Sequence, residues 1–150
     1  MLGQPELIFE PFPSDDLRRF IEDNVSTFTM AMVSAVDYQP VGYFLRQDRG
    51  EWVGGCLGNV WAEYLHVQWL WVAPSLRGRG FGARLLRAAE TMGQDNGAAN
   101  ATLDTFNPVA KEFYLRQGYE VFGTLEDYPP GWSKFLLRKK LVRRDDRPTR

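Results

Sequence analysis

The chain has 150 residues, of which 44% are hydrophobic and 25% are charged, and its formal net charge is −1. This size and composition indicate a globular protein with one hydrophobic core. Proteins that grip nucleic acid usually carry a strongly basic face, so the near-neutral balance disfavours that class. One cysteine and one histidine are too few for an internal disulfide or a zinc cluster of these residues.

The first thirteen residues lack the basic and then apolar pattern of a signal peptide, and no apolar run approaches the length of a membrane span. We therefore expect a cytoplasmic protein that binds neither a membrane nor nucleic acid. We also expect a single domain over residues 1–142, followed by a charged C-terminal tail over residues 143–150.

The first predicted elements in chain order are a short strand and a helix. The pattern of Leu7 to Phe9 indicates the strand, which two nearby prolines would end. Ser14 and Asp15 are favourable N-cap residues for a helix from Asp16 to about Asn24. Residues 25–39 fit no single element.

Three strands are predicted next, over residues 42–47, 51–62 and 65–72. The Gly54-Gly55 pair would weaken a plain strand, so we expect a β-bulge there. Simple alternation in the third strand places Leu65, Val67, Trp69 and Trp71 on one face and His66, Gln68, Leu70 and Val72 on the other.

The second half of the chain alternates predicted helices and strands. The predicted elements are a helix from a glycine-rich loop to about residue 96, a strand over 101–105, a helix over 108–118 capped by Asn107, and strands over 119–125 and 135–141. The resulting order is strand, helix, three strands, helix, strand, helix, two strands. It predicts a mixed α/β (α+β) sheet and not a regularly alternating doubly wound one.

The glycine-rich loop, Arg77-Gly78-Arg79-Gly80-Phe81-Gly82, is the main functional signal. Glycine lets the backbone approach a ligand closely, and the start of a helix attracts anions. The loop therefore predicts a site for phosphate. A plain turn before the helix is the alternative, although such a turn needs fewer glycines.

The same loop also matches part of the dinucleotide-binding fingerprint. Gly78, Gly80 and Ala83 fit the pattern, and Asp104 follows at a suitable distance. However, that fingerprint abuts its strand, whereas residues 73–77 intervene here, and too little chain remains for further βα units. A Walker-type loop is excluded because no Gly-Lys-Ser or Gly-Lys-Thr follows.

Residues 72–86 resemble the acetyl-CoA motif of the GNAT superfamily of N-acetyltransferases, whose form Q/R-x-x-G-x-G/A is matched by Arg77, Gly80 and Gly82. A second family segment, N-x-x-A-x-x-x-Y-x-x-x-G-F/Y, is matched by Asn107, Ala110, Tyr114, Gly118 and Tyr119. The resemblance covers about residues 40–141 and extends to a bacterial subgroup whose acceptors are mostly unassigned.

The resemblance implies a GNAT-like acyl-CoA N-acyltransferase fold, with splayed central strands flanked by helices. It implies acetyl-CoA as co-substrate, no metal, and direct transfer to a primary amine of a small molecule or peptide in a ternary complex. Backbone groups of Leu70 and Val72 would pair with the pantetheine arm. The cofactor-binding residues implied are Leu70, Trp71, Val72, Arg77, Gly78, Arg79, Gly80, Phe81, Gly82, Ala83 and Asn107.

The resemblance also implies catalytic roles. Tyr114 matches the family's acid, which would protonate the departing thiolate, and a core aromatic role is its alternative. An amine must lose a proton before it attacks, and His66, Asp104 and Glu63 are the candidate bases. His66 lies where some family members carry a catalytic glutamate; a hydrogen-bonded structural histidine is the alternative. For Asn107 the alternative is a helix cap alone.

The acceptor stays open at this stage. Glu63, Asp104, Glu126 and Asp127 would give an acidic mouth that favours a cationic amine, whereas solvated surface acids are the alternative. Two functions of other classes also stay open, namely a non-catalytic acyl-CoA sensor and a nicotinamide-dependent enzyme. The resemblance further implies that a homodimer, formed through a sheet edge or a C-terminal strand, would not be unusual.

Overall fold

The computed structural model of the chain describes residues 4–33 and 37–141. It divides into two compact units, residues 1–36 and residues 37–150, and each is described by itself. The expected single domain over residues 1–142 stays a prediction, and the tail over residues 143–150 lies outside the described residues. No helix in the described ranges is long and apolar enough to cross a membrane.

The first unit consists of an extended segment and one helix, α1 (Asp15–Met32). The predicted cap is confirmed, because the Ser14 hydroxyl oxygen accepts a hydrogen bond from the Leu17 N–H at 3.2 Å. The helix continues past Asn24 to Met32, since neither glycine nor proline interrupts it. The strand predicted at Leu7–Phe9 is wrong. No described strand pairs with it, and an isolated strand has no partners for its backbone hydrogen bonds.

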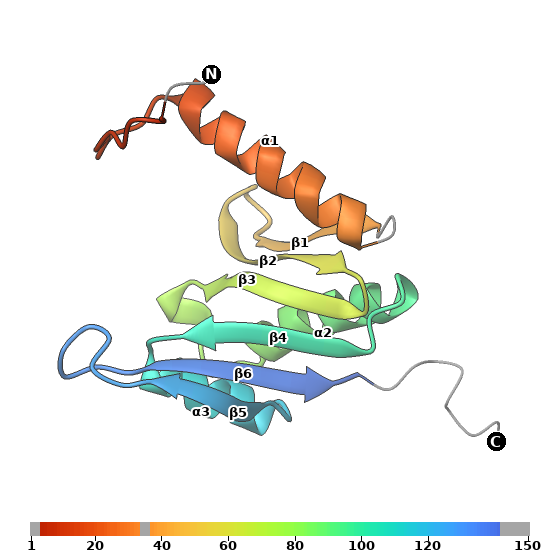
Figure 1. The fold of residues 1–150 in the computed structure, drawn as a ribbon. Coiled ribbons are helices and arrows are strands. Elements are labelled where there is room, and N and C mark those ends of the chain that lie inside the picture. Colours follow the sequence, from red (N-terminus) through yellow and green to blue (C-terminus); the bar gives the residue numbers. More distant parts are fainter. Residues whose placement is uncertain (1–3, 34–36, 142–150) are drawn as a thin grey trace. The chain divides into compact units, whose positions relative to one another are not determined.

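The second unit is a six-stranded mixed sheet in the order β1-β2-β3-β4-β6-β5 (Figure 1). Its strands are β1 (Tyr38–Arg46), β2 (Trp52–Trp61), β3 (Tyr64–Val72), β4 (Asn100–Thr105), β5 (Glu120–Leu125) and β6 (Lys134–Lys140). Its helices are η1 (Pro74–Leu76), α2 (Phe81–Asp95) and α3 (Pro108–Arg116). Among the six described strands, only β3 and β4 are parallel neighbours. The predicted mixed α/β class and the order of these elements are confirmed.

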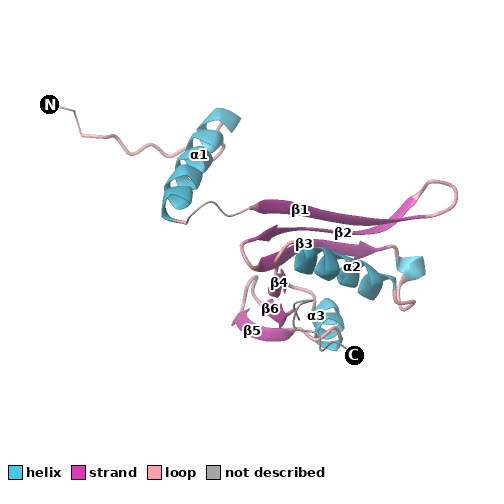
Figure 2. Ribbon diagram, turned by 90° about the vertical axis from the view of Figure 1, so that its right-hand side faces the viewer, coloured by secondary structure: helices cyan, strands magenta, loops and turns pink. Residues whose placement is uncertain are grey.

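Helices α2 and α3 cover the same face of the sheet, which we call the helix face (Figures 1 and 2). Leu65, Ala101 and Leu137 from three strands are fully buried beneath them. The buried Glu90 of α2 accepts hydrogen bonds from the Tyr119 hydroxyl at 3.0 Å and from the Lys139 ammonium at 2.8 and 2.9 Å. These bonds tie α2 to the C-terminal half of the sheet. The opposite surface is called the far face.

A β-bulge changes the direction of side chains halfway along β3. Leu57 pairs with Trp69 and Gly58 pairs with Val67, so Gln68 is an extra residue in β3. Leu65, Val67, Leu70 and Val72 therefore contribute to the core on the helix face, whereas His66, Trp69 and Trp71 belong to the far face. The predicted simple alternation was wrong, because it ignored the extra residue.

Gly54 and Gly55 both keep regular pairing with β3. Against β1, however, the register shifts beside Gly54: Leu45 pairs with Gly54 and Arg46 pairs with Trp52, so Val53 is an extra residue. The β-bulge expected at Gly54-Gly55 is therefore present next to that pair, one residue earlier, and close packing also favours glycine at both positions. A Cβ on Gly54 would lie 3.0 Å from the Trp71 carbonyl oxygen, and one on Gly55 would lie 2.9 Å from the Phe44 ring.

Strands β3 and β4 separate soon after they begin. They pair only from Tyr64, Leu65 and His66 to residues 100–102, and the rest of β3 has no neighbour on that side. The separation begins beside the bulge, where a strand bends and twists more strongly. The splayed central strands expected from the resemblance are thus present in the sheet.

We predict that Gly58→Ala will lower the free energy of unfolding by about 1–3 kcal/mol, the usual cost of overpacking. A Cβ at this position would overlap the His66 carbonyl oxygen, and backbone cannot rotate away as a side chain can. Urea unfolding measures the change. Gly42→Ala is the matched control, because its Cβ would lie 3.4 Å from flexible side-chain atoms of Leu57 and Phe44. Equal losses in the two variants would contradict the prediction.

Candidate active site

The glycine-rich loop joins η1 to α2. Gly78 and Gly80 have φ values of +71° and +82°, which side chains other than glycine rarely adopt. A Cβ at either position would meet nothing within 4 Å, so backbone conformation rather than space requires glycine there. Gly80 is the N-cap of α2, and no side chain caps this helix. The N–H groups of its first turn are therefore available to an anion.

Arg77 fixes the start of this loop. Its Nε donates a hydrogen bond to the Val72 carbonyl oxygen at 2.9 Å, across five residues of chain. The bond holds the turn after β3 closed, and it keeps the guanidinium group beside the end of that strand. Arg77 thus has a structural role in addition to any contact with a ligand.

A cavity of about 570 Å³ occupies the space where β3 and β4 separate, and we call it the cleft. It brings together the three residues predicted to be catalytic: His66 from β3, Asp104 from the end of β4 and Tyr114 from α3. The lining residues are His66, Val67, Gln68, Trp69, Leu70, Asp104, Thr105, Phe106, Asn107, Ala110 and Tyr114.

Residues from both faces of the sheet line the cleft. His66 and Trp69 lie on the far face, whereas Val67 and Leu70 lie on the helix face, to which α3 adds Tyr114. His66 and Leu70 were predicted to share a face, and the bulge makes that wrong. They line the same cavity nonetheless, because the separated strands leave an opening between the two faces.

His66 is half-buried and has no hydrogen-bond or ion-pair partner among the residues that the structure describes. A structural histidine normally satisfies its ring nitrogens with such partners. The imidazole of His66 is therefore available to a molecule in the cleft.

Asp104 is differently placed. Its carboxylate oxygen lies 3.0 Å from the Lys134 ammonium, which also lies over the Phe106 ring, 5.3 Å from the centroid. Phe106 packs against Tyr128 of the loop between β5 and β6, with ring centroids 5.7 Å apart. Of this cluster, the Asp104 carboxylate and the Phe106 ring line the cleft, and Lys134 and Tyr128 support them from outside it.

Tyr114 is a buried side chain that reaches the cleft from the helix face. Its ring packs edge-on against Phe113 and Tyr119, at centroid distances of 5.1 and 5.7 Å. Burial, with a smaller contribution from the nearby Cys56, raises the pKa of Tyr114 to about 12. Its hydroxyl therefore keeps its proton near neutral pH and can donate a hydrogen bond.

Cys56, the one cysteine of the chain, is fully buried on β2 and does not line the cleft. Burial is the main cause that raises its pKa to about 11, and the Glu90 carboxylate adds to the effect. The thiol is consequently protonated at neutral pH, and nothing in its surroundings activates it as a nucleophile.

Asn107 caps α3, because its Oδ1 accepts hydrogen bonds from the Val109 and Ala110 N–H groups at 2.9 and 3.3 Å. It also lines the cleft, so the cap and a contact with a ligand are compatible. Trp71, Val72 and Glu63 do not line the cleft. Glu63 instead accepts backbone hydrogen bonds through its carbonyl oxygen, from the N–H groups of residues 99 and 100.

Other residues of the predicted cofactor set lie around the start of α2. Gly82 and Ala83 are in its first turn, and Arg79 and Phe81 line a second cavity. The sequence interpretation missed Thr105, Phe106 and Lys134 as neighbours of the site. Thr105 and Phe106 follow Asp104 directly in the sequence, and this was the available signal for them. Lys134 comes near Asp104 only because β4 pairs with β6, and the sequence did not reveal that pairing.

Comparisons with known proteins found similar sequences. The model of the acetyltransferase (GNAT) family matches residues 5–119. Blasticidin-S acetyltransferase of Streptomyces morookaense is 40% identical over 95 residues, which are 63% of this chain and 70% of that protein. Acetyltransferase Atu2258 of Agrobacterium fabrum is 30% identical over 125 residues, or 83% of this chain and 91% of the relative.

Solved structures are similar as well. An acetyltransferase from Bacillus cereus has a TM-score of 0.82 at 28% identity, with 91% of this chain and 98% of that chain covered. A Bacillus anthracis protein solved in complex with acetyl coenzyme A has a TM-score of 0.63 at 17% identity, with 69% of this chain and 64% of that chain covered. The second similarity concerns the fold alone.

We predict that Cys56 will react with a thiol reagent about 100-fold more slowly in the native protein than after unfolding, at about pH 8. The factor follows from a rise in pKa from 9.0 to about 11, because the thiolate is the reactive form. The rate is measured by the absorbance of the aromatic thiolate that the reagent releases. The same protein in concentrated guanidinium chloride is the control. Rapid reaction of the native protein would contradict the burial of this thiol.

Proposed function

The chain belongs to the GNAT family of acetyltransferases, and from this premise we propose that it transfers the acetyl group of acetyl-CoA to a primary amine of a small molecule. The single observation that carries the proposal is the cleft between β3 and β4, which gathers His66, Asp104 and Tyr114 from three elements. Attack is direct, in a complex of enzyme, donor and acceptor. The burial of Cys56 supports this, because no other thiol is available to carry the acetyl group.

The donor is held by backbone groups on the helix-face side of the cleft. The unpaired edge of β3 around Leu70 offers N–H and C=O groups, with which an amide-bearing chain can pair like an added strand. The loop from Arg77 to Gly82 and the first turn of α2 receive the pyrophosphate. Asn107 donates its side-chain amide N–H₂ to the same chain while its oxygen caps α3.

His66 is the base. The donor supplies an acetyl thioester with an electrophilic carbonyl carbon. The amine nitrogen forms a bond to this carbon. The proton lost by that nitrogen goes to the imidazole of His66, directly or through one water. Two observations favour His66 over Asp104: its ring has no other partner among the described residues, whereas Asp104 is paired with Lys134.

Tyr114 assists the departure of the thiolate when the carbon–sulfur bond breaks. Its pKa of about 12 lies above that of an ordinary thiol, near 8.5, so complete transfer of the proton to sulfur is uphill. The hydroxyl therefore acts as a hydrogen-bond donor to the developing charge, and solvent supplies the final proton. This refines the expectation that Tyr114 is a simple acid.

The acceptor enters from the far face. His66 and Trp69 are on that side, while Tyr114 is on the helix face. The amine therefore contacts His66 on one face, and the leaving sulfur contacts Tyr114 on the other. The relative named blasticidin-S acetyltransferase supports a small-molecule acceptor rather than a peptide. A cytoplasmic location and a homodimer stay predictions.

The proposed function is tested by a thiol-release screen with acetyl-CoA and a panel of amines, peptides and aminated antibiotics. In it, Tyr114→Phe should lower kcat about 100-fold, the usual contribution of such a group, while the affinity for acetyl-CoA is unchanged. Tyr119→Phe is the matched control, because it removes a buried hydroxyl bonded to Glu90 and outside the cleft. Full turnover by Tyr114→Phe, or an equal loss in Tyr119→Phe, would show that the assignment is wrong. Binding of acetyl-CoA without turnover on any amine would indicate an acyl-CoA sensor.

We predict that His66→Gln will lower kcat/KM about 100-fold near pH 7 and progressively less as the pH rises toward 10. At high pH the amine loses its proton to solvent, so the base is no longer needed. Rate profiles of the wild type and of the variant provide the measurement. Asp104→Asn should keep the wild-type profile shape. If Asp104→Asn, and not His66→Gln, abolishes the fall of kcat/KM toward acidic pH, Asp104 is the base instead.

A further inference from the structure

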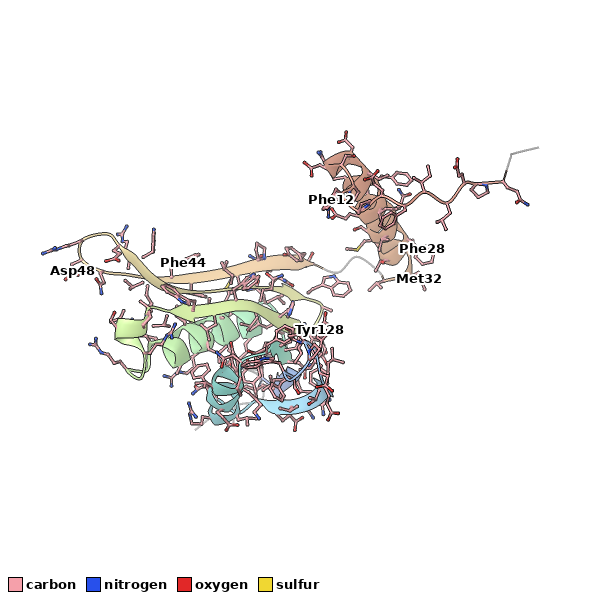
Figure 3. All side chains as sticks on the ribbon, turned by 90° about the vertical axis from the view of Figure 1, so that its left-hand side faces the viewer. Phe12, Phe28, Met32, Phe44, Asp48 and Tyr128 are labelled. Carbon is pink, nitrogen blue, oxygen red and sulfur yellow. The ribbon has the colours of Figure 1, made fainter. Side chains whose placement is uncertain are left out.

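A second cavity, of about 660 Å³, lies between the tip of the β1–β2 hairpin and the start of α2, and we call it the hairpin pocket. No residue lines both this pocket and the cleft. Phe44 on β1 and Asp48 at the hairpin tip mark its upper wall in Figure 3. The glycine-rich loop and the first turn of α2 supply the opposite wall.

Four arginines line the hairpin pocket, two from each wall. Arg46 and Arg49 belong to the hairpin, and Arg79 and Arg84 flank the N-cap of α2. None of the four forms an ion pair with a described carboxylate, although Asp48 lies in the same lining. The chain as a whole has a net charge of −1, so this is a local concentration of unpaired positive charge.

Aromatic rings hold two of these guanidinium groups in place. Arg46 lies over the Trp52 ring and Arg79 over the Phe81 ring, each 5.5 Å from the centroid. Stacking of this kind uses the flat surface of a guanidinium group and leaves its N–H donors free at the edge. The guanidinium donors of Arg46 and Arg79 are thus held in place without being used by another described residue.

We propose that the hairpin pocket binds a phosphomonoester. Four guanidinium groups repel one another unless an anion lies among them, and the planar fork of each matches two phosphate oxygens. The N-terminus of α2 beside the pocket adds to the attraction. Two ligands carry this chemistry: the ribose 3′-phosphate of the acetyl-CoA donor itself, and a separate phosphorylated molecule. Only the first source rests on the proposed function.

Calorimetric titration distinguishes the two sources. The probes are acetyl-CoA, its 3′-dephospho analogue, and adenosine 3′,5′-bisphosphate added to protein saturated with that analogue. The pocket variant is Arg46→Gln with Arg49→Gln, and Arg84→Gln tests the opposite wall independently. The matched control, Arg87→Gln with Arg116→Gln, makes the same change in charge at exposed residues outside both cavities.

If the donor's own phosphate occupies the pocket, the wild type and the control bind acetyl-CoA at least about tenfold more tightly than the analogue, and the pocket variants lose this preference. If a separate ligand occupies it, both donors bind equally, and the bisphosphate binds to all but the pocket variants. The proposal is overturned if the pocket variants match the control with every probe. A wild type that binds neither donor, but binds the bisphosphate when it is added alone, would contradict the proposed function and still support binding at the pocket.

Discussion

The parting of β3 from β4 is the constraint on which the site depends. Two parallel strands normally pair along their whole length, and here the ladder stops after His66. The extra residue Gln68 bends β3 just beyond that point, and Gly58 on β2 leaves the space that the bent backbone occupies. A continuous ladder would use the backbone groups of β3 and would close the cavity between the strands. The cleft therefore exists because a local irregularity interrupts the sheet.

The same irregularity separates the two halves of the chemistry. A bulge moves every later side chain to the opposite face, so His66 and Leu70 point to different sides of one opening. Tyr114 approaches from the side that the helices cover, where burial keeps its proton in place. The proposed base and the proposed donor to sulfur are thus assigned to opposite faces, so that one can serve the attacking nitrogen and the other the departing sulfur.

Among the described residues, charged side chains are paired in the packed parts of the structure and unpaired beside the start of α2. The buried Glu90 is satisfied by Tyr119 and Lys139, and Asp104 is paired with Lys134. The arginines of the hairpin pocket have no such partners within residues 4–33 and 37–141. Opposite charges thus neutralise one another where the sheet and helices pack, whereas positive charge is left free beside the start of α2. A net charge near zero conceals this arrangement, because it sums over regions with different roles.

How far the sequence alone determined this protein is clear from particular residues. Local signals located α2 and α3, since Gly80, Asn107 and Pro108 act through the backbone next to them. The same signals singled out the glycine-rich loop and identified the family. Local signals could not give the pairing of β4 with β6, which brings Lys134 to Asp104, or the bulge at Gln68, which reverses the direction of later side chains. Those features arise from contacts between segments that are distant in the chain. The residues next to each position in the sequence do not determine such contacts, so local patterns could not predict them.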